Sequence, residues 1–393
     1  MTASPSHNWR KRAVLARNFL LDGLMALSPR AARQPDKAEV LLVRLDAIGD
    51  FVLWLDAAAA LRRLFPPDRY RLVLLGNALW SDLAALQPCF DEVIGVDLKQ
   101  FHNSPGYRCN LWRRLRSRRW DIAINPTCSR HFPYDDAVIR VCGARERIGS
   151  EGDLANQRQW EKRISNRWYT RLLPARRGTM MELERNAEFV RGLGLAQFSP
   201  RLSRLEVPAL AVAFPQPYYV VVPGAGRAMR QWPVENFAAV MRMIWDRYRL
   251  KAVICGAPGE EPVGRQLQQL LQGQAEVEDR TGVTTLPEFC ALIRDAVMVL
   301  GNESSSIHIA AAVGTSSICL AGGGHFGRFV PYPELDADRR ALPVTLFQRM
   351  ECFNCNWDCI HPCQGTVAPC LERVTVDEVW RAAGELLNRE GVL

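Results

Sequence analysis

The amino-acid sequence predicts an α/β protein built from two doubly wound, Rossmann-like domains. First, its 393 residues exceed the roughly 250–300 residues that one hydrophobic core organises. Second, short apolar runs alternate with helical stretches in both halves of the chain. Third, the apolar runs of the second half end in glycine or small polar residues, and doubly wound sheets bind ligands at that end of their strands.

The composition narrows the class of protein and of partner. Hydrophobic residues at 48% and charged residues at 23% are ordinary globular values, which argues against a disordered or membrane-embedded chain. The net charge of +8 suits an anionic partner, either a phosphorylated small molecule, a membrane surface or nucleic acid. Because no nucleic-acid-binding signature accompanies the arginines, we expect no nucleic-acid partner.

Residues 1–38 are expected to form a basic, amphipathic extension. Residues 1–12 lack the apolar core of an export signal, so we expect a cytoplasmic location. The apolar segment Val14–Leu27 is shorter than the roughly 20 residues that span a bilayer. It could lie on an anionic membrane surface, which would make the protein peripheral to the membrane, or pack on the protein itself or on another subunit of a homo-oligomer.

The first domain is predicted over residues 39–210 and opens with a strand, a turn and a helix. The continuous apolar run Glu39–Val43 is typical of a parallel strand covered on both faces. A tight turn is expected at Ile48-Gly49-Asp50, before a helix that ends at Pro66. Further strands are expected at Arg71–Leu75, Glu92–Val96 and Asp121–Asn125.

Asp50 is the candidate catalytic residue of this domain. It follows Gly49 at the end of the opening strand, where a carboxylate that projects toward a nucleotide can act as a general base. The alternative is that Asp50 caps the N-terminus of the helix.

The second domain is predicted over residues 211–375, after a proline-rich connection at 201–217, and a C-terminal helix is expected at 376–393. Its strands are expected within Tyr218–Gly226, Lys251–Gly259, Ala296–Ser304 and Ser316–Gly324.

Three turns that follow these strands indicate a nucleoside diphosphate ligand. The turn at 301–306 precedes an apolar helix start, so its free N–H groups and the helix dipole favour an anion, although its serines could simply cap the helix. Arg230, after the turn at 223–226, can clamp a phosphate, and acids after the turn at 255–259 can accept ribose hydroxyls. The candidate donor-binding residues are Gly49, Gly224, Ala225, Arg230, Gly256, Glu260, Glu303, Ser304, Ser305, Ser306 and His308.

Three motifs in this order resemble glycosyltransferase family 9, whose best-known members are the heptosyltransferases of lipopolysaccharide core assembly. They are RLDAIGD at 44–50, the Pro223-Gly224-Ala225 turn with Arg230-Gln231-Trp232-Pro233, and the stretch 281–315. The resemblance implies a GT-B fold with two domains facing a cleft, an ADP-heptose donor held mainly by the second domain, and inversion at the anomeric carbon.

The resemblance also implies the roles of individual residues. The catalytic aspartate of the family falls on Asp50, its phosphate-binding lysine on Arg230, and its GNDTGPMH loop on Gly301–His308. Glu303 replaces an aspartate of that loop, and serines replace Thr-Gly-Pro. A transferase for another nucleotide sugar, or a non-catalytic protein that binds nucleotide sugars, are the alternatives. A nicotinamide dehydrogenase is disfavoured because no Gly-x-Gly-x-x-Gly follows the first strand.

The expected reaction needs no divalent metal. Asp50 would take the proton of an acceptor hydroxyl, on a saccharide or a protein, while Arg230 and the helix N-terminus after Ser306 stabilise the leaving diphosphate. An Asp-Xaa-Asp motif at 336–338, which could hold a divalent ion, lies in a polar stretch and is interpreted as a solvated loop.

Five cysteines between residues 352 and 370 have the spacing of a structural thiolate site for zinc or iron, with free thiols or disulfides as the alternative. The family resemblance implies Cys352, Cys355, Cys363 and Cys370 as ligands, which leaves Cys359 spare. His361 is a substitute ligand in this interpretation.

Overall fold

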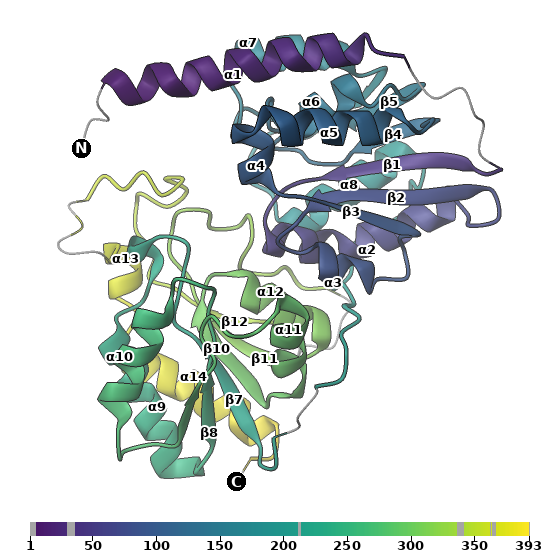
Figure 1. Cartoon of the computed structure of the whole chain (residues 1–393). Coiled ribbons are helices and arrows are strands. Elements are labelled where there is room, and N and C mark those ends of the chain that lie inside the picture. The colour runs from purple at the N-terminus through teal and green to yellow at the C-terminus, as the bar shows by residue number, and fades with distance from the viewer. Residues whose placement is uncertain are drawn as a thin grey trace. The chain divides into compact units, whose positions relative to one another are not determined.

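The computed structural model describes residues 5–29, 36–210, 214–335, 342–361, 363 and 367–392. The chain divides into two compact units, each built on one sheet (Figure 1). We call the first the N-terminal unit and the second the C-terminal unit. The N-terminal unit comprises Met1–Phe51, Ala57–Gly178 and Leu183–Pro200, and the C-terminal unit comprises Val52–Asp56, Thr179–Glu182 and Arg201–Leu393.

The N-terminal unit holds a six-stranded sheet in the order β3-β2-β1-β4-β5-β6, and all neighbouring strands are parallel. Helices lie on both faces, as a doubly wound sheet requires (Figure 1). The strands are β1 (Ala38–Arg44), β2 (Tyr70–Asn77), β3 (Glu92–Val96), β4 (Ile122–Asn125), β5 (Glu146–Ser150) and β6 (Arg171–Leu173). The helices are α1 (Pro5–Ala26), α2 (Ile48–Leu64), α3 (Ser81–Ala85), α4 (Leu98–Asn103), α5 (Pro105–Arg116), α6 (Asp135–Val141), α7 (Gln159–Ser165) and α8 (Glu182–Leu193). Of these helices, residues Val52–Asp56 of α2 and Glu182 of α8 are counted with the C-terminal unit.

The C-terminal unit repeats this plan with the strand order β12-β11-β10-β7-β8-β9, again with parallel neighbours. Its strands are β7 (Tyr218–Val222), β8 (Lys251–Ile254), β9 (Val277–Asp279), β10 (Met298–Asn302), β11 (Ser316–Leu320) and β12 (Val344–Leu346). Its helices are α9 (Val234–Tyr248), α10 (Glu261–Leu271), α11 (Leu286–Asp295), α12 (Ser305–Val313), α13 (Pro369–Glu372) and α14 (Val376–Arg389).

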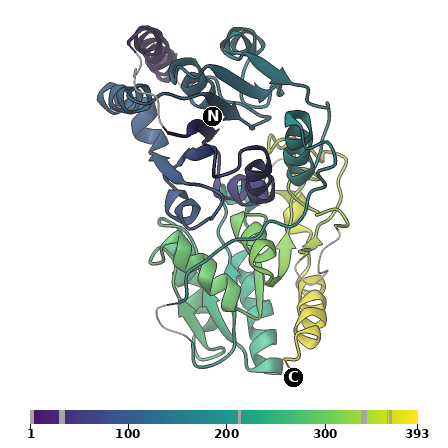
Figure 2. The ribbon, with the colours of Figure 1, turned by 90° about the vertical axis from the view of Figure 1, so that its right-hand side faces the viewer.

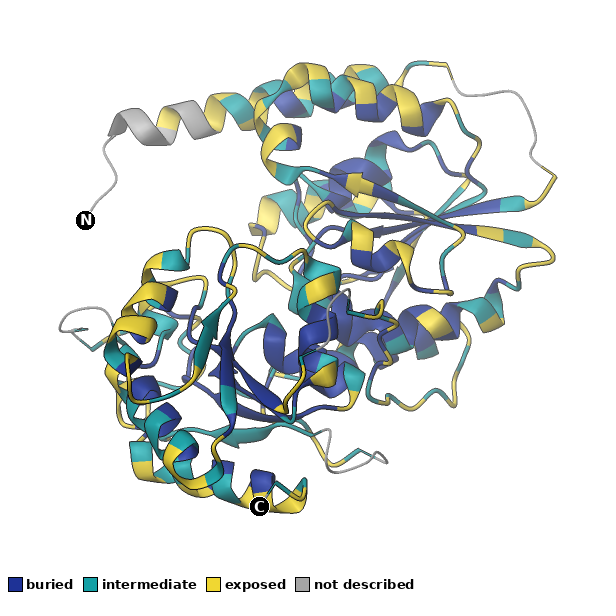
Figure 3. Ribbon diagram, turned by 60° about the horizontal axis from the view of Figure 1, so that its bottom comes forward, coloured by how far each residue is buried: buried dark blue, intermediate teal, exposed yellow. Residues whose placement is uncertain are grey.

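Apolar side chains from strands and helices form a separate core in each unit. The central strands carry no exposed residue over most of their length, as their dark colour shows in Figure 3. In the C-terminal unit, α14 packs beside α9 and buries Val379, Leu386 and Leu387 in the same core as Val221 (Figure 2). The C-terminal helix is therefore an integral part of this unit.

The structure corrects some of the expected elements. The turn expected at Ile48–Asp50 is wrong, because these residues form the first turn of α2 after the extended Ala47. Four strands were not expected, namely β5, β6, β9 and β12. Each has only three to five residues and is partly exposed, so none shows the continuous apolar run of a buried strand.

Helix α1 is longer than its predicted apolar segment, and it packs against α4, α5 and α6. In the described ranges, no helix is long and apolar enough to cross a membrane. The expected connection contains neither helix nor strand in residues 201–210 and 214–217.

Candidate active site

The carboxyl ends of β7, β8 and β10 gather three loops at one edge of the C-terminal sheet. These strands are neighbours in the order β10-β7-β8, and parallel strands all end at the same edge. The loops are residues 223–233, 255–260 and 303–304, and they contain most of the predicted donor-binding residues.

Asn302 fastens the loop 223–233 to the end of β10. Its buried side chain accepts a hydrogen bond from the Trp232 backbone N–H at 2.9 Å and donates to the Pro223 carbonyl at 2.7 Å. The loop that carries Arg230 is therefore tied at both ends to the last residue of β10. We did not predict this role, because an asparagine inside a turn motif gives no sign of which backbone groups it will bind.

Glu303 carries a buried carboxyl group whose loss of water is not offset by hydrogen bonds in the described structure. It is 5% exposed, and its carboxylate oxygens make no hydrogen bond within the described part of the chain. Arg230 Nη2 lies 3.9 Å from Glu303 Oε1 and donates to the Glu303 carbonyl at 3.0 Å. Burial raises the pKa of Glu303 to about 7, although the positive charge of Arg230 opposes the shift. A buried polar group without a partner at this edge is what a missing ligand would leave.

The serines lie at the start of α12. Ser304 precedes the helix with an extended backbone, and its side chain makes no capping hydrogen bond in the described structure. Its hydroxyl instead pairs with that of Ser306 at 2.8 Å. The simple capping alternative is therefore wrong for Ser304, and the first N–H groups of α12 keep their capacity to bind an anion.

His308 lies one turn into α12 and is buried. Its Nδ1 pairs with the Tyr332 hydroxyl at 2.8 Å, and burial lowers the pKa of His308 to about 4. The imidazole is therefore neutral near pH 7, and it would offer a ligand a neutral polar edge.

Glu260 joins the ends of β7 and β8. Its carboxylate accepts a hydrogen bond from the Ala257 N–H at 2.8 Å. A Cβ added at Gly224 would lie 2.3 Å from the Glu260 carboxyl group, and one at Gly256 would lie 2.9 Å from it, so these glycines make room for the acid. Ala225 lies in the same loop, where its carbonyl accepts a hydrogen bond from Gln231.

In the N-terminal unit, Gly49 and Asp50 lie in the first turn of α2, and Asp50 is half-buried. The N-cap position is Ala47, so the interpretation of Asp50 as an N-cap is wrong. The fully buried Arg44 pairs with Asp46 at 2.7 Å and donates to the Asp50 carbonyl at 3.3 Å. Arg44 thus stabilises the first turn of α2, which carries the candidate base Asp50.

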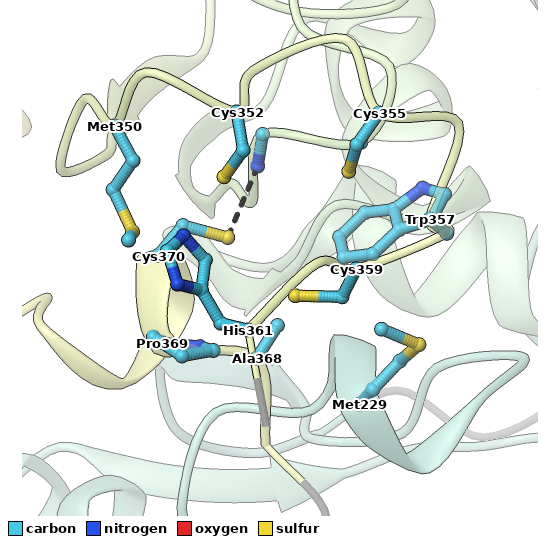
Figure 4. A pocket seen from close by; sticks show the side chains of 12 residues that line it. Met229, Met350, Cys352, Cys355, Trp357, Cys359, His361, Ala368, Pro369 and Cys370 are labelled. Carbon is cyan, nitrogen blue, oxygen red and sulfur yellow. Dashed lines mark hydrogen bonds between the residues drawn. The ribbon is translucent and has the colours of Figure 1, made fainter. Parts of the chain in front are cut away.

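We call residues 350–370 the cysteine segment, and its described part packs against the end of β11. The side chains of Cys352, Cys355, Cys359 and Cys370 line one cavity together with His361, and their sulfur atoms are turned toward a common space (Figure 4). Cys363 does not line this cavity, and its thiol donates a hydrogen bond to the His361 carbonyl at 3.8 Å. In the part of the chain that the structure describes, no three cysteine, histidine or acidic side chains form a group that could hold a metal ion.

Three glycines, Gly322 to Gly324, follow β11, and aromatic rings of the cysteine segment fill the space beside them. An added Cβ would lie 2.4 Å from Trp357 at Gly322 and 2.3 Å from Phe353 at Gly323. The glycines therefore make room for the cysteine segment. The Asp-Xaa-Asp motif at 336–338 lies outside the described residues.

Comparisons with known proteins identify the family of the chain. A family model described as "Glycosyltransferase family 9 (heptosyltransferase)" matches residues 108–342. Lipopolysaccharide heptosyltransferase 3 of Escherichia coli K12 is 25% identical over 305 residues, which cover 73% of this chain and 83% of that protein.

The chain is also similar to solved structures, and two of them bear on its function. One is E. coli ADP-heptose lipopolysaccharide heptosyltransferase II, with a TM-score of 0.67, 17% identity, and coverage of 90% of this chain and 99% of that one. The other is the iron-containing dodecameric glycosyltransferase TibC of enterotoxigenic E. coli, with a TM-score of 0.50, 16% identity, and coverage of 91% and 78%. The fold is therefore GT-B, as predicted. The chain belongs to glycosyltransferase family 9 and is a glycosyltransferase of the heptosyltransferase type.

Proposed function

We propose that the protein transfers a heptose from ADP-heptose to a hydroxyl group of a saccharide or protein acceptor, with inversion at the anomeric carbon. The observation that carries this proposal is the buried carboxyl of Glu303 beside Arg230 and the N-terminus of α12, because the three together suit a sugar diphosphate. The ADP-heptose in the name of the similar heptosyltransferase II supports this donor.

Several of the donor-binding residues have specific roles in this proposal. The first N–H groups of α12 and the Arg230 guanidinium bind the diphosphate, and Glu260 accepts hydrogen bonds from the ribose hydroxyls. Gly224 and Gly256 leave room for the Glu260 carboxyl group in this position. Glu303 faces the transferred sugar, and in its neutral form it can donate as well as accept a hydrogen bond.

The reaction is a direct displacement. Asp50 takes the proton of the acceptor hydroxyl as its oxygen attacks the anomeric carbon. The bond from that carbon to the phosphate oxygen breaks through an oxocarbenium-like transition state, and ADP leaves. Arg230 and the α12 N-terminus stabilise the charge that grows on the diphosphate, so the reaction needs no divalent metal.

A panel of nucleotide sugars tests this function. Purified protein is given ADP-heptose, ADP-glucose, UDP-glucose and GDP-mannose, and both donor binding and release of the nucleotide are measured. Asp50→Asn is compared with wild type and with Asp82→Asn, which changes an exposed aspartate in the first turn of another helix, α3.

We expect ADP-heptose to be the preferred donor, and Asp50→Asn to lower kcat by about 10²–10⁴-fold with unchanged ADP affinity. Asp82→Asn should behave as wild type. Failure to bind any nucleoside diphosphate would rule out the function as a whole. Unchanged turnover in Asp50→Asn would rule out only the role of this residue.

We also propose that the cysteine segment holds a structural zinc or iron ion. The support lies in the chemistry of the donors, since four thiols and one imidazole line one cavity (Figure 4), although no three of the described side chains form a complete ligand group. The similar TibC is described as iron-containing. Cys352, Cys355 and Cys370 would be ligands, and either Cys363, which the family resemblance implies, or Cys359, which lines the cavity, would be the fourth. The ion would cross-link the segment.

Elemental analysis of the purified chain tests the metal. One zinc or iron per chain is expected in wild type and in Cys109→Ser, a control outside the segment. Cys352→Ser and Cys370→Ser should lose it, and the pair Cys359→Ser and Cys363→Ser identifies the fourth ligand. Wild-type protein that carries no metal after growth with zinc and iron would refute the proposal.

Finally, we propose that the protein acts in the cytoplasm at the surface of a membrane, which it contacts through α1. The supporting observation is a row of exposed leucines on this helix. Assembly into a homo-oligomer, as in the dodecameric TibC, is the competing use of the same surface.

A further inference from the structure

Trp357 belongs to the cysteine segment, and its ring packs against the glycines that follow β11. It is 7% exposed and packs against Gly322 and Gly324, where an added Cβ would lie 2.4 Å and 2.3 Å from the indole. Its backbone has φ of 60°, in the left-handed region that a bulky residue rarely adopts. Packing of the ring therefore holds the Trp357 backbone in a conformation that is unfavourable for a tryptophan by itself.

The Trp357 ring also contacts the side chain of Arg230. The centre of the Arg230 guanidinium lies 4.8 Å from the centroid of the Trp357 ring, which is within the range of a cation–π contact. The same guanidinium donates to the Glu303 carbonyl at 3.0 Å. Arg230 is thus held from two sides, by the α12 loop and by the cysteine segment.

Two backbone contacts fasten the segment near Arg230. The Ala368 N–H donates to the carbonyl of Met229, the residue before Arg230, at 3.0 Å. The Gly323 N–H donates to Cys370 Sγ at 3.4 Å, as the dashed line in Figure 4 marks. Met229 itself lines the cysteine cavity. The loop that carries Arg230 and the cysteine segment therefore form one packed assembly.

We propose that Trp357 is a positioning residue for the donor diphosphate and acts through Arg230. An arginine side chain has many rotamers, and fixing it on binding costs conformational entropy. The indole face holds the guanidinium beside the α12 N-terminus before the ligand arrives, so less entropy is lost when the diphosphate binds. The inference rests on the proposed function of Arg230. It gives the cysteine segment a role in donor affinity.

The test is ADP binding by calorimetry to four full-length proteins: wild type, Trp357→Ala, Trp357→Phe and Phe353→Leu. Phe353 is the matched control, because it belongs to the same segment and packs on Gly323 and Phe326. We expect Trp357→Ala to raise the ADP Kd by about 3–30-fold, and Trp357→Phe, which keeps a ring face, to restore most of the affinity. Phe353→Leu should bind as wild type.

A double-mutant cycle with Arg230→Ala separates positioning from a general loss of structure. If Trp357 acts through Arg230, then Trp357→Ala should not weaken ADP binding further in the Arg230→Ala background. Independent, multiplying losses would overturn the inference, and so would wild-type affinity in Trp357→Ala. A wild-type protein that binds no nucleoside diphosphate would instead refute the proposed function, and the inference with it.

Discussion

At the scale of single residues, Glu303 shows how burial tunes the site. The family resemblance implies an aspartate at this position, and the longer glutamate side chain is buried without a hydrogen-bond partner in the described structure. Burial favours the neutral carboxylic acid over the carboxylate, which is why its pKa is raised to about 7. The protein therefore loses stability when this group ionises, unless a ligand or Arg230 compensates.

Glu303→Gln should change how stability depends on pH. Because the folded pKa is raised, wild type is most stable below the ordinary glutamate pKa of 4.5 and loses stability as pH rises from there to about 7. Across this pH range, we expect the free energy of unfolding of the variant to rise by on the order of 3 kcal/mol relative to that of wild type. Denaturant unfolding at pH 4.5, 6 and 7.5 measures it.

Glu235→Gln, an exposed change on α9 of the same unit, is the control and should leave the pH dependence as in wild type. A constant difference between Glu303→Gln and wild type at all three pH values would contradict a raised pKa at Glu303.

At the scale of elements, α1 has one face anchored and one face bare. Its anchored face carries Asp22, which pairs with the buried Arg108 of α5 at 2.6 Å and accepts a hydrogen bond from Trp112 at 2.9 Å. Arg140 of α6 lies 4.4 Å from the Phe19 ring and donates to the Phe19 carbonyl. Much of the arginine-rich stretch 108–119 thus serves folding, since Arg108 and Arg116 are also buried.

The opposite face of α1 is an apolar row without cover in the described structure. Trp9, Leu20, Leu24 and Leu27 are 60–85% exposed, and the exposed Ala13 and Ala16 lie between them at helical spacing. The only acid of α1 is the buried Asp22, whereas residues 10–12 are Arg-Lys-Arg. Apolar residues and tryptophan beside basic charge suit an anionic lipid surface better than a second copy of the same basic helix.

The double variant Leu20→Glu/Leu24→Glu should detach the protein from anionic vesicles. In sedimentation with vesicles of phosphatidylcholine and phosphatidylglycerol, we expect partitioning to fall about tenfold or more, because two apolar side chains are replaced by negative charges that the anionic lipid repels. Vesicles of phosphatidylcholine alone should bind wild type weakly. Leu86→Glu, an exposed leucine beside α3, is the control.

If wild type binds neither kind of vesicle and the double variant changes the oligomeric mass in light scattering, then the row is an interface between subunits, and the membrane proposal is wrong.

At the scale of the whole molecule, the donor-binding residues are concentrated in one unit. Apart from Gly49, all of them lie in the C-terminal unit, whereas Asp50 lies in the N-terminal unit. The two units have separate cores, so a ligand that binds one of them need not stabilise the other.

Amide hydrogen exchange should therefore show a local effect of ADP. We expect slower exchange at 223–232 and 301–308 when ADP is present, since the nucleotide binds the native loops and suppresses their opening. Residues 126–153 of the N-terminal unit should exchange as in the free protein. The Arg230→Ala variant should lose most of the protection. Equal protection in both units would contradict a donor site confined to the C-terminal unit.

The central strands were predictable because each carries its own signal. Val40–Val43 and Tyr218–Val222 are buried on both faces, so the local sequence alone reveals them. The edge strands β6 and β9 are short and half-exposed. Their strand conformation depends more on pairing with a neighbouring strand than on the β-propensity of their own residues. A single stretch of sequence does not show which neighbouring strand it will pair with.

By itself, the sequence determined the two-unit α/β plan, the family and the glycine-rich loops, because short contiguous motifs encode these features. Only the tertiary structure decided that Asn302 ties the Arg230 loop to β10, that Gly322 and Gly324 make room for Trp357, and that Cys359 faces the cavity. Such contacts join residues far apart in the chain, and no local periodicity records which distant side chain will fill a given space.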